Sequence, residues 1–178
     1  MNNEPDKPHA SPDPSSFVRA AVECHQAPLL RYAARLLGDA DRARDVVQDT
    51  FVRLMAQPPA RVDGHLAEWL FTVCRNRTHD VLRKEGRMKR FEEGQVERLT
   101  APDPRPGRGL EHAEQSETVL RLIGRLPANQ QEVVRLKFQN GFSYQEISRI
   151  TSLSVTNVGF ILHTAIKTLR QAMAAQAE

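Results

Sequence analysis

The sequence predicts an all-α protein made of two small helical domains joined by a flexible linker, the second of which contains a helix-turn-helix. Three observations support this fold class. Apolar residues recur at helical spacing through most of the 178 residues. No stretch alternates with the period of a strand for long enough to predict one. The segment TAPDPRPGRG at 100–109 interrupts the helical pattern with proline and glycine, which indicates a boundary between domains.

Composition narrows the class of protein only modestly. The formal net charge is +3 and the isoelectric point is near 9.1, which suits a polyanionic partner without establishing one. Cys24 and Cys74 lie far apart without metal-binding spacing, so we expect two small buried side chains in a reducing compartment. No segment is typical of a signal peptide or long enough to span a membrane, which favours a cytoplasmic protein without membrane contact.

Four segments follow from these boundaries. A polar, proline-rich tail is expected over 1–15, where the composition favours disorder. The first helical domain is expected over 16–94, the linker over 95–112, and the second helical domain over 113–175.

Three helices are predicted in the first domain. The first runs over 17–37, and Gly38 suits the position just after a helix end. Asp39 or Asp41 can cap the second helix, which stops before a pair of prolines. The third helix is predicted over 66–84. Each fully buried aliphatic side chain contributes roughly 1.5–3 kcal/mol, so the apolar stripes of these helices suffice for a small bundle.

The second domain is predicted to end in the helix-turn-helix. The helical spacing of apolar residues resumes over 111–125, and Pro127 opens a further helix that ends at Asn140-Gly141. Ser143 and Glu146 have the spacing of a capping box, and Ser154 can cap the last helix. The core-facing stripe of that last helix is expected to be Val155, Val158, Leu162, Ala165, Leu169 and Met173. Such a helix pair places the N-terminus of its second helix in the DNA major groove.

The outward face of the last helix is where base edges and phosphates would be met. Thr156 and Asn157 lie in the first turn, where threonine can contact a thymine methyl and asparagine can bond to an adenine edge. Lys167 suits a phosphate. Phe160 leaves two interpretations open: it packs against a neighbouring helix, or it contacts a thymine methyl or a protein partner. Gly159, which costs a helix roughly 1 kcal/mol relative to alanine, either permits close approach of a backbone or is tolerated.

Two other helix faces carry charge. A dense run of basic residues over 75–90 is either an ordinary solvated face or a surface that follows a nucleic-acid strand. In the second helix Asp45, Gln48, Asp49 and Arg53 point away from the apolar stripe. That face is either solvated or a docking surface for a protein.

No catalytic constellation is found. The six histidines are scattered, and neither a metalloprotease or deaminase motif nor a glycine-rich phosphate loop is present. We therefore expect no catalytic residues, no metal site and no cofactor.

Together these faces resemble the two-domain extracytoplasmic-function (ECF) group of the sigma-70 family, the specificity subunits of bacterial RNA polymerase. Three segments carry the resemblance, in the family's order and spacing: ARDVVQDTFVRL at 43–54, the stretch from Trp69-Leu70 to Arg83, and the stretch from Leu126-Pro127 through the recognition helix. The likeness covers nearly everything over 17–173.

The resemblance implies a role for each face. The second helix would dock on the β′ clamp of core RNA polymerase through Asp45, Gln48, Asp49 and Arg53. The third helix would hold the minus-ten promoter element through Arg75, Asn76, Arg77, Arg83 and Lys84. The helix-turn-helix would meet the minus-thirty-five duplex through Glu146, Thr156, Asn157, Phe160, His163 and Lys167. The β flap is a second expected polymerase contact, and whether an anti-sigma factor also binds is left open.

The implied mechanism is strand capture, in which binding energy from extruded bases and single strand offsets duplex opening without ATP. One feature departs from the family, whose recognition helix often carries Arg or Lys where this chain has Gly159, Ile161, Thr164 and Ile166. Fewer cations predict fewer phosphate contacts and a shallower dependence of binding on salt.

The leading hypothesis is therefore a subunit that binds core RNA polymerase and directs promoter recognition, DNA melting and initiation. The alternative is a stand-alone, dimeric helix-turn-helix regulator, which leaves the first domain and its acidic face without a role. A nucleic-acid enzyme is a third class, and no residue set supports it.

Overall fold

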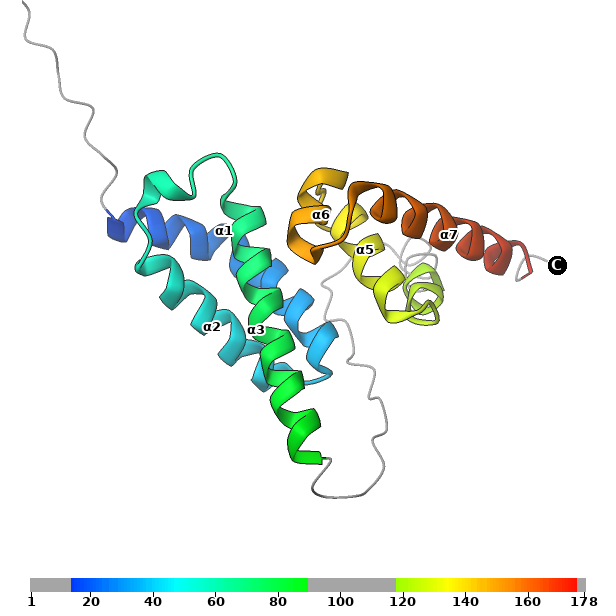
Figure 1. Cartoon of the computed structure of the whole chain (residues 1–178), viewed down its shortest axis with the longest axis horizontal. Helices are drawn as coiled ribbons and strands as arrows, with labels where there is room; N and C mark the ends of the chain where they lie inside the picture. Colours follow the sequence, from blue (N-terminus) through cyan, green and yellow to red (C-terminus); the bar gives the residue numbers. More distant parts are fainter. Residues whose placement is uncertain (1–13, 90–117, 176–178) are drawn as a thin grey trace, which may run out of the picture.

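Every regular element in the described residues, 14–89 and 118–175, is a helix in the computed structural model of the chain (Figure 1). This confirms the predicted all-α class. The expected linker over 95–112 lies outside the described residues, as does the expected tail up to residue 13, and the first helix begins at Pro14. None of the described helices is both long and apolar enough to cross a membrane.

Three helices of the N-terminal module pack against one another as a bundle. Its elements are α1 (Pro14–Leu37), α2 (Ala40–Met55), the short 3-10 helix η1 (Pro59–Arg61) and α3 (Leu66–Lys89). Gly38 takes a left-handed φ of 70° between α1 and α2, a conformation that glycine adopts at no steric cost. Asp39 caps α2, because its Oδ1 accepts the backbone N–H groups of Asp41 and Arg42 at 2.9 and 3.0 Å.

The C-terminal module contains the predicted helix-turn-helix. Its elements are a helical segment over 118–124, α5 (Ala128–Phe138), α6 (Tyr144–Thr151) and α7 (Val155–Ala174). The capping box is formed: Ser143 Oγ accepts from Glu146 N–H at 3.2 Å, and Glu146 Oε2 accepts from Ser143 N–H at 2.7 Å. Ser152 turns the chain in the left-handed region, and Ser154 caps α7 by accepting from Asn157 N–H.

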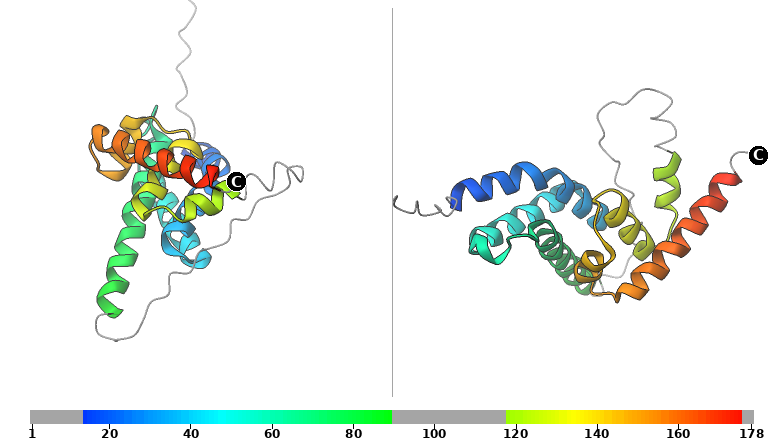
Figure 2. Two further views of the ribbon diagram at one scale, coloured as in Figure 1. Left: turned by 90° about the vertical axis from the view of Figure 1, so that its right-hand side faces the viewer. Right: turned by 90° about the horizontal axis from the view of Figure 1, so that it is seen from above.

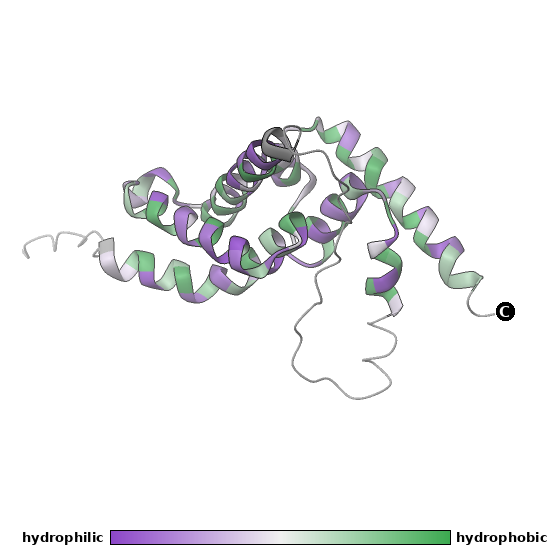
Figure 3. Cartoon of the chain, turned by 90° about the horizontal axis from the view of Figure 1, so that it is seen from below, coloured by the Kyte–Doolittle hydropathy of each residue, from purple (hydrophilic) through white to green (hydrophobic). Residues whose placement is uncertain are grey.

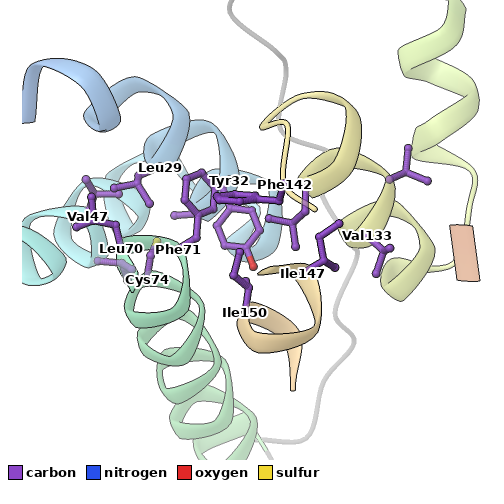
Figure 4. Packing of buried hydrophobic residues seen from close by; sticks show 14 of the residues in the cluster. Leu29, Tyr32, Val47, Leu70, Phe71, Cys74, Val133, Phe142, Ile147 and Ile150 are labelled. Carbon is purple, nitrogen blue, oxygen red and sulfur yellow. The ribbon is translucent and has the colours of Figure 1, made fainter. Parts of the chain in front are cut away.

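Hydrophobic and hydrophilic residues mix along each helix (Figure 3). Most of the buried apolar residues form one cluster that spans both modules. Phe71 of α3 lies at its centre, with ring centroids 5.2 Å from Tyr32 and 5.0 Å from Phe142. Phe142, which precedes α6, meets Phe71 edge to face (Figure 4). The two modules are therefore packed together through α3 and α6.

The two cysteines differ in their surroundings. Cys74 is fully buried, and burial raises the pKa of its thiol to about 12, so it acts as a small apolar side chain as expected. Cys24 is exposed, so the expectation of a buried side chain there is wrong.

The predicted stripe of α7 is wrong at its two ends. Val155 and Met173 are exposed, whereas Val158, Leu162 and Ala165 are buried together with Ile161. Val155 is the first residue of the helix. Met173 lies in the last turn and is 49 % exposed, and that end of α7 extends away from α5 and α6 (Figure 2). Helical periodicity predicts which side faces inward but not how far the neighbouring helices reach.

Candidate nucleic-acid and protein interfaces

The acidic face of α2 lies opposite the residues that α2 buries. Asp45, Gln48 and Arg53 are exposed and Asp49 is half-buried. Positions 45, 48, 49 and 52 succeed one another at helical spacing, so they share one side of α2. Met55, which is 69 % exposed, continues this side with an apolar group that the sequence reasoning missed. Its helical spacing from Gln48 and Val52 was the signal that could have found it.

An open groove of about 550 Å³ runs between α2 and α3, and most of its lining side chains are charged. Two ion pairs join the helices across this region. Arg77 Nε donates to Asp49 Oδ2 at 2.8 Å, and the Arg42 guanidinium donates to Glu85. Asp49 of the acidic face is therefore bonded to a residue of the basic helix.

The basic residues of α3 do not form one continuous face. Arg75 and Arg77 are two residues apart, about 200° around a helix, so they point to different neighbours. Arg77 meets α2, whereas Arg75 is directed at α5. Asn76, Arg83 and Lys84 are exposed, and Arg83 also pairs with Asp80 one turn earlier. The side chains of 87–90, the end of the predicted basic run, lie outside the described residues.

Arg75 is held in the contact between the modules. Its Nε donates to Glu132 Oε1 at 2.7 Å, and the hydroxyl of Tyr32 donates to the same oxygen at 2.6 Å. The side chains of Arg75 and Glu132 are only 18 % and 10 % exposed. Burial first, and then the charge and hydrogen bond of Glu132, raise the pKa of Tyr32 well above its usual value, so its hydroxyl remains a donor.

A second ion pair crosses the same contact. Both Arg149 Nε and Arg149 Nη2 donate to the Glu68 carboxylate at 2.7 Å, the bidentate geometry that suits guanidinium and carboxylate. Glu68 and Arg149 are 81 residues apart in the chain. No periodicity in the sequence could have paired them.

The predicted recognition face is brought together on α7. Thr156, Asn157, Phe160, His163 and Lys167 are all exposed. Phe160 is 68 % exposed, so the interpretation that it packs against a neighbouring helix is wrong.

Glu146 stands apart from the other members of this set, because its carboxylate belongs to the capping box of α6. Hydrogen bonds from the Ser143 side chain and backbone lower the pKa of Glu146. Tyr144, the first residue of α6, lies beside Gly159 of α7: a Cβ built on Gly159 would be 3.7 Å from the Tyr144 ring. The ammonium of Lys137 lies 5.5 Å from the centre of that ring, within cation–π range.

In the part of the chain that the structure describes, no three or more His, Cys, Asp or Glu side chains form a group that could hold a metal ion.

Comparisons with known proteins match both modules to one family. The family model "Sigma-70 region 2" matches residues 21–88, and "Sigma-70, region 4" matches residues 116–169. The ECF RNA polymerase sigma factor SigL of Mycobacterium tuberculosis is 32% identical over 162 residues, 88% of each chain. The ECF RNA polymerase sigma factor EcfG of Rhodopseudomonas palustris is 32% identical over 133 residues, which cover 74% of this chain and 71% of that protein.

Solved structures show the same fold. The sigma factor RpoE of Bartonella quintana, in complex with the anti-sigma factor NepR, gives a TM-score of 0.73 at 23% identity and covers 89% of this chain and 98% of that one. CnrH in complex with the cytosolic domain of CnrY gives a TM-score of 0.59 at 22% identity and covers 90% of each chain.

Proposed function

The chain belongs to the sigma-70 family, in its ECF group, and on that premise we propose how its exposed faces divide the start of transcription among them. As a sigma factor it binds core RNA polymerase and promoter DNA and directs initiation at a specific set of promoters. It is a regulatory subunit of the polymerase, and we propose that it carries no catalytic residues of its own. We place it in the cytoplasm, where promoter DNA and polymerase meet.

The acidic face of α2 is the proposed contact with the β′ clamp. Asp45, Gln48, Asp49 and Arg53 supply its charged and polar groups. Met55 adds an exposed apolar group at the end of the same side. A charged rim beside an apolar contact is the usual composition of a protein interface, which supports this face over an ordinary solvated surface.

The exposed side of α3 is the proposed minus-ten surface. Asn76, Arg83 and Lys84 are exposed in the packed arrangement of the two modules, with Arg83 paired to Asp80 of its own helix. Arg75 and Arg77 are instead engaged by Glu132 and Asp49 of other helices. We propose that all five meet the non-template strand, with the two engaged arginines changing partners when they do. A captured strand then offsets the cost of opening the duplex.

The N-terminal half of α7 is the proposed minus-thirty-five surface. It presents Thr156, Asn157, Phe160, His163 and Lys167 to the major groove. Glu146 reaches the DNA from the first turn of α6, and the C-terminal module also contacts the β flap. The two solved neighbours hold an anti-sigma factor or the cytosolic domain of a second protein, so we include a protein of the anti-sigma class among the candidate partners.

The observation that carries this assignment is that region 2 and region 4 modules occur in one chain, and that most of the candidate residues of each module lie exposed on its helices. The test is run-off transcription with purified core polymerase and a promoter library. New start sites that depend on the chain support the proposal. A stable dimer that binds palindromic DNA and leaves the start sites unchanged would favour the stand-alone regulator.

Asp45→Arg is a direct test of the docking face, and Glu23→Arg is its matched control because Glu23 is an exposed acid on α1. We expect Asp45→Arg to lose co-elution with core polymerase and Glu23→Arg to keep it. Equal behaviour of the two variants would overturn the docking face but not the family assignment.

A further inference from the structure

Phe160 is a large apolar side chain of the C-terminal module that lies exposed on α7. It is 68 % exposed, although a large aromatic ring gains more by burial than most side chains. It lies on the outward side of α7, one turn after Thr156 and one turn before His163 and Thr164. Its exposure thus falls at the centre of the face proposed to enter the major groove.

The part of α7 around Phe160 lacks acidic, lysine and arginine side chains. Residues 155–166 include no Asp, Glu, Lys or Arg. Positive charge is found instead at the margins: Lys167 follows two turns later on the same side, and Lys137 lies over the Tyr144 ring beside Gly159. The face therefore has an apolar centre and cationic edges.

A DNA major groove has the matching arrangement, with base edges at its floor and phosphates along its rims. The thymine 5-methyl is the apolar group on that floor, and phenylalanine, which has no hydrogen-bonding group, can contact it but cannot bond to guanine, cytosine or adenine edges. A protein partner would also suit an exposed ring, but the flanking cations favour a polyanion. Residues 155–166 of α7 also carry no carboxylate that would repel phosphates.

We propose that Phe160 reads thymine 5-methyl groups in the minus-thirty-five element, so that this sigma factor selects its promoters in part by apolar contact. The inference rests on the proposed function, because it requires α7 to lie in the groove. It also accounts for the low charge of this helix: specificity comes from methyl contacts at its centre, and phosphate contacts come from its edges.

The test uses holoenzyme assembled from the full chain and core polymerase on a promoter selected from a library. Each thymine of its minus-thirty-five element is replaced in turn by deoxyuracil, which lacks only the 5-methyl group. We expect at least one replacement to weaken promoter binding by about fourfold, the change that corresponds to about 0.8 kcal/mol for one methyl-sized group. In the Phe160→Ala variant, the same replacement of thymine by deoxyuracil should not weaken promoter binding any further.

Phe138→Ala is the matched control, because Phe138 is 63 % exposed on α5 of the same module. It should keep the full effect of deoxyuracil. Phe160→Leu should keep part of it, since leucine retains an apolar contact. Thermal unfolding of Phe160→Ala checks that the exposed substitution leaves the fold unchanged.

Three outcomes would overturn the inference. The first is a selected element in which no thymine responds to deoxyuracil. The second is an equal deoxyuracil effect in wild type and Phe160→Ala. The third is a methyl-independent loss of polymerase binding in Phe160→Ala, which would assign the ring to a protein contact. Failure of the proposed function looks different, because then neither wild type nor any variant would direct new start sites.

Discussion

The Arg77 guanidinium donates to the Asp49 carboxylate at 2.8 Å, and this ion pair joins the proposed polymerase-docking face to the proposed minus-ten helix. Both side chains are substantially exposed, so the pair contributes little to stability, about 1 kcal/mol or less. Its interest lies in the two surfaces that it connects. A partner that takes Asp49 releases Arg77, and a strand that takes Arg77 releases Asp49.

Asp49→Arg should abolish binding to core polymerase, because it places a cation beside Arg77 and removes the acid from the docking face. A double variant that exchanges the two residues, Asp49→Arg with Arg77→Asp, restores the ion pair but not the acid at position 49. We expect the exchange variant to unfold at the wild-type temperature and still fail to co-elute with core polymerase. Recovered co-elution would mean that Asp49 acts only through Arg77.

Glu132→Gln should strengthen binding of a minus-ten single strand to the full chain. The carboxylate holds Arg75 in a contact where both side chains are largely buried, and glutamine keeps the size of the group without its charge. We expect the affinity for the strand to rise about tenfold, equivalent to about 1.4 kcal/mol, when binding is measured by fluorescence anisotropy with a labelled oligonucleotide.

Arg75→Ala combined with Glu132→Gln is the control, and this double variant should show no such gain. A gain of the same size in the double variant would show that Arg75 is not the group released. Small-angle scattering of Glu132→Gln, compared with wild type, measures whether the modules also separate.

The local features of the fold were predictable, whereas the contacts between modules were not. The capping box, the Ser154 cap and the exposure of Thr156 all depend on residues within one or two helical turns, and each is present. Glu132 and Arg75 are 57 residues apart, and Phe71 and Phe142 lie in different modules. Such pairs depend on how two finished modules pack, which spacing along the chain does not encode.

The dependence of contacts on packing also explains why the residues predicted for the minus-ten surface do not all share one face. The sequence groups its cations by their proximity along the chain, but a helix turns about 100° per residue, so neighbours in sequence face different partners. Arg75 and Arg77 are separated in this way. Helical spacing predicts the minus-thirty-five residues on α7, and these residues are exposed together.

Glu146→Ala should lower stability at neutral pH by about 1 kcal/mol, the usual contribution of an N-terminal cap. The pKa of Glu146 is lower in the folded protein than its unfolded value near 4.5. The part of its contribution that depends on the charge is therefore complete above about pH 4.5 and is lost as the pH falls through the lower, folded-state pKa. Thermal unfolding of wild type and variant should differ at pH 7 and converge in acid.

Glu146→Gln separates capping from DNA contact. Glutamine can still accept from Ser143 N–H but lacks the charge, so the variant should lose less stability at pH 7 than Glu146→Ala. If the carboxylate meets the minus-thirty-five duplex, promoter binding by holoenzyme at a temperature where the variant is folded will change more in Glu146→Gln than this small loss of stability explains. Unchanged binding would confine Glu146 to the cap.

Gly159→Ala decides why a glycine occupies the recognition helix. An added Cβ would lie 3.7 Å from the Tyr144 ring, an ordinary van der Waals distance, so nothing within the protein requires glycine there. Alanine should raise stability by about 1 kcal/mol, because glycine is the poorer helix former. The added Cβ is directed at Tyr144 and not at the side of α7 that holds Phe160, so we expect promoter binding by holoenzyme to be unchanged. A more stable variant that binds its promoter less well would instead show that DNA approaches the backbone at this position.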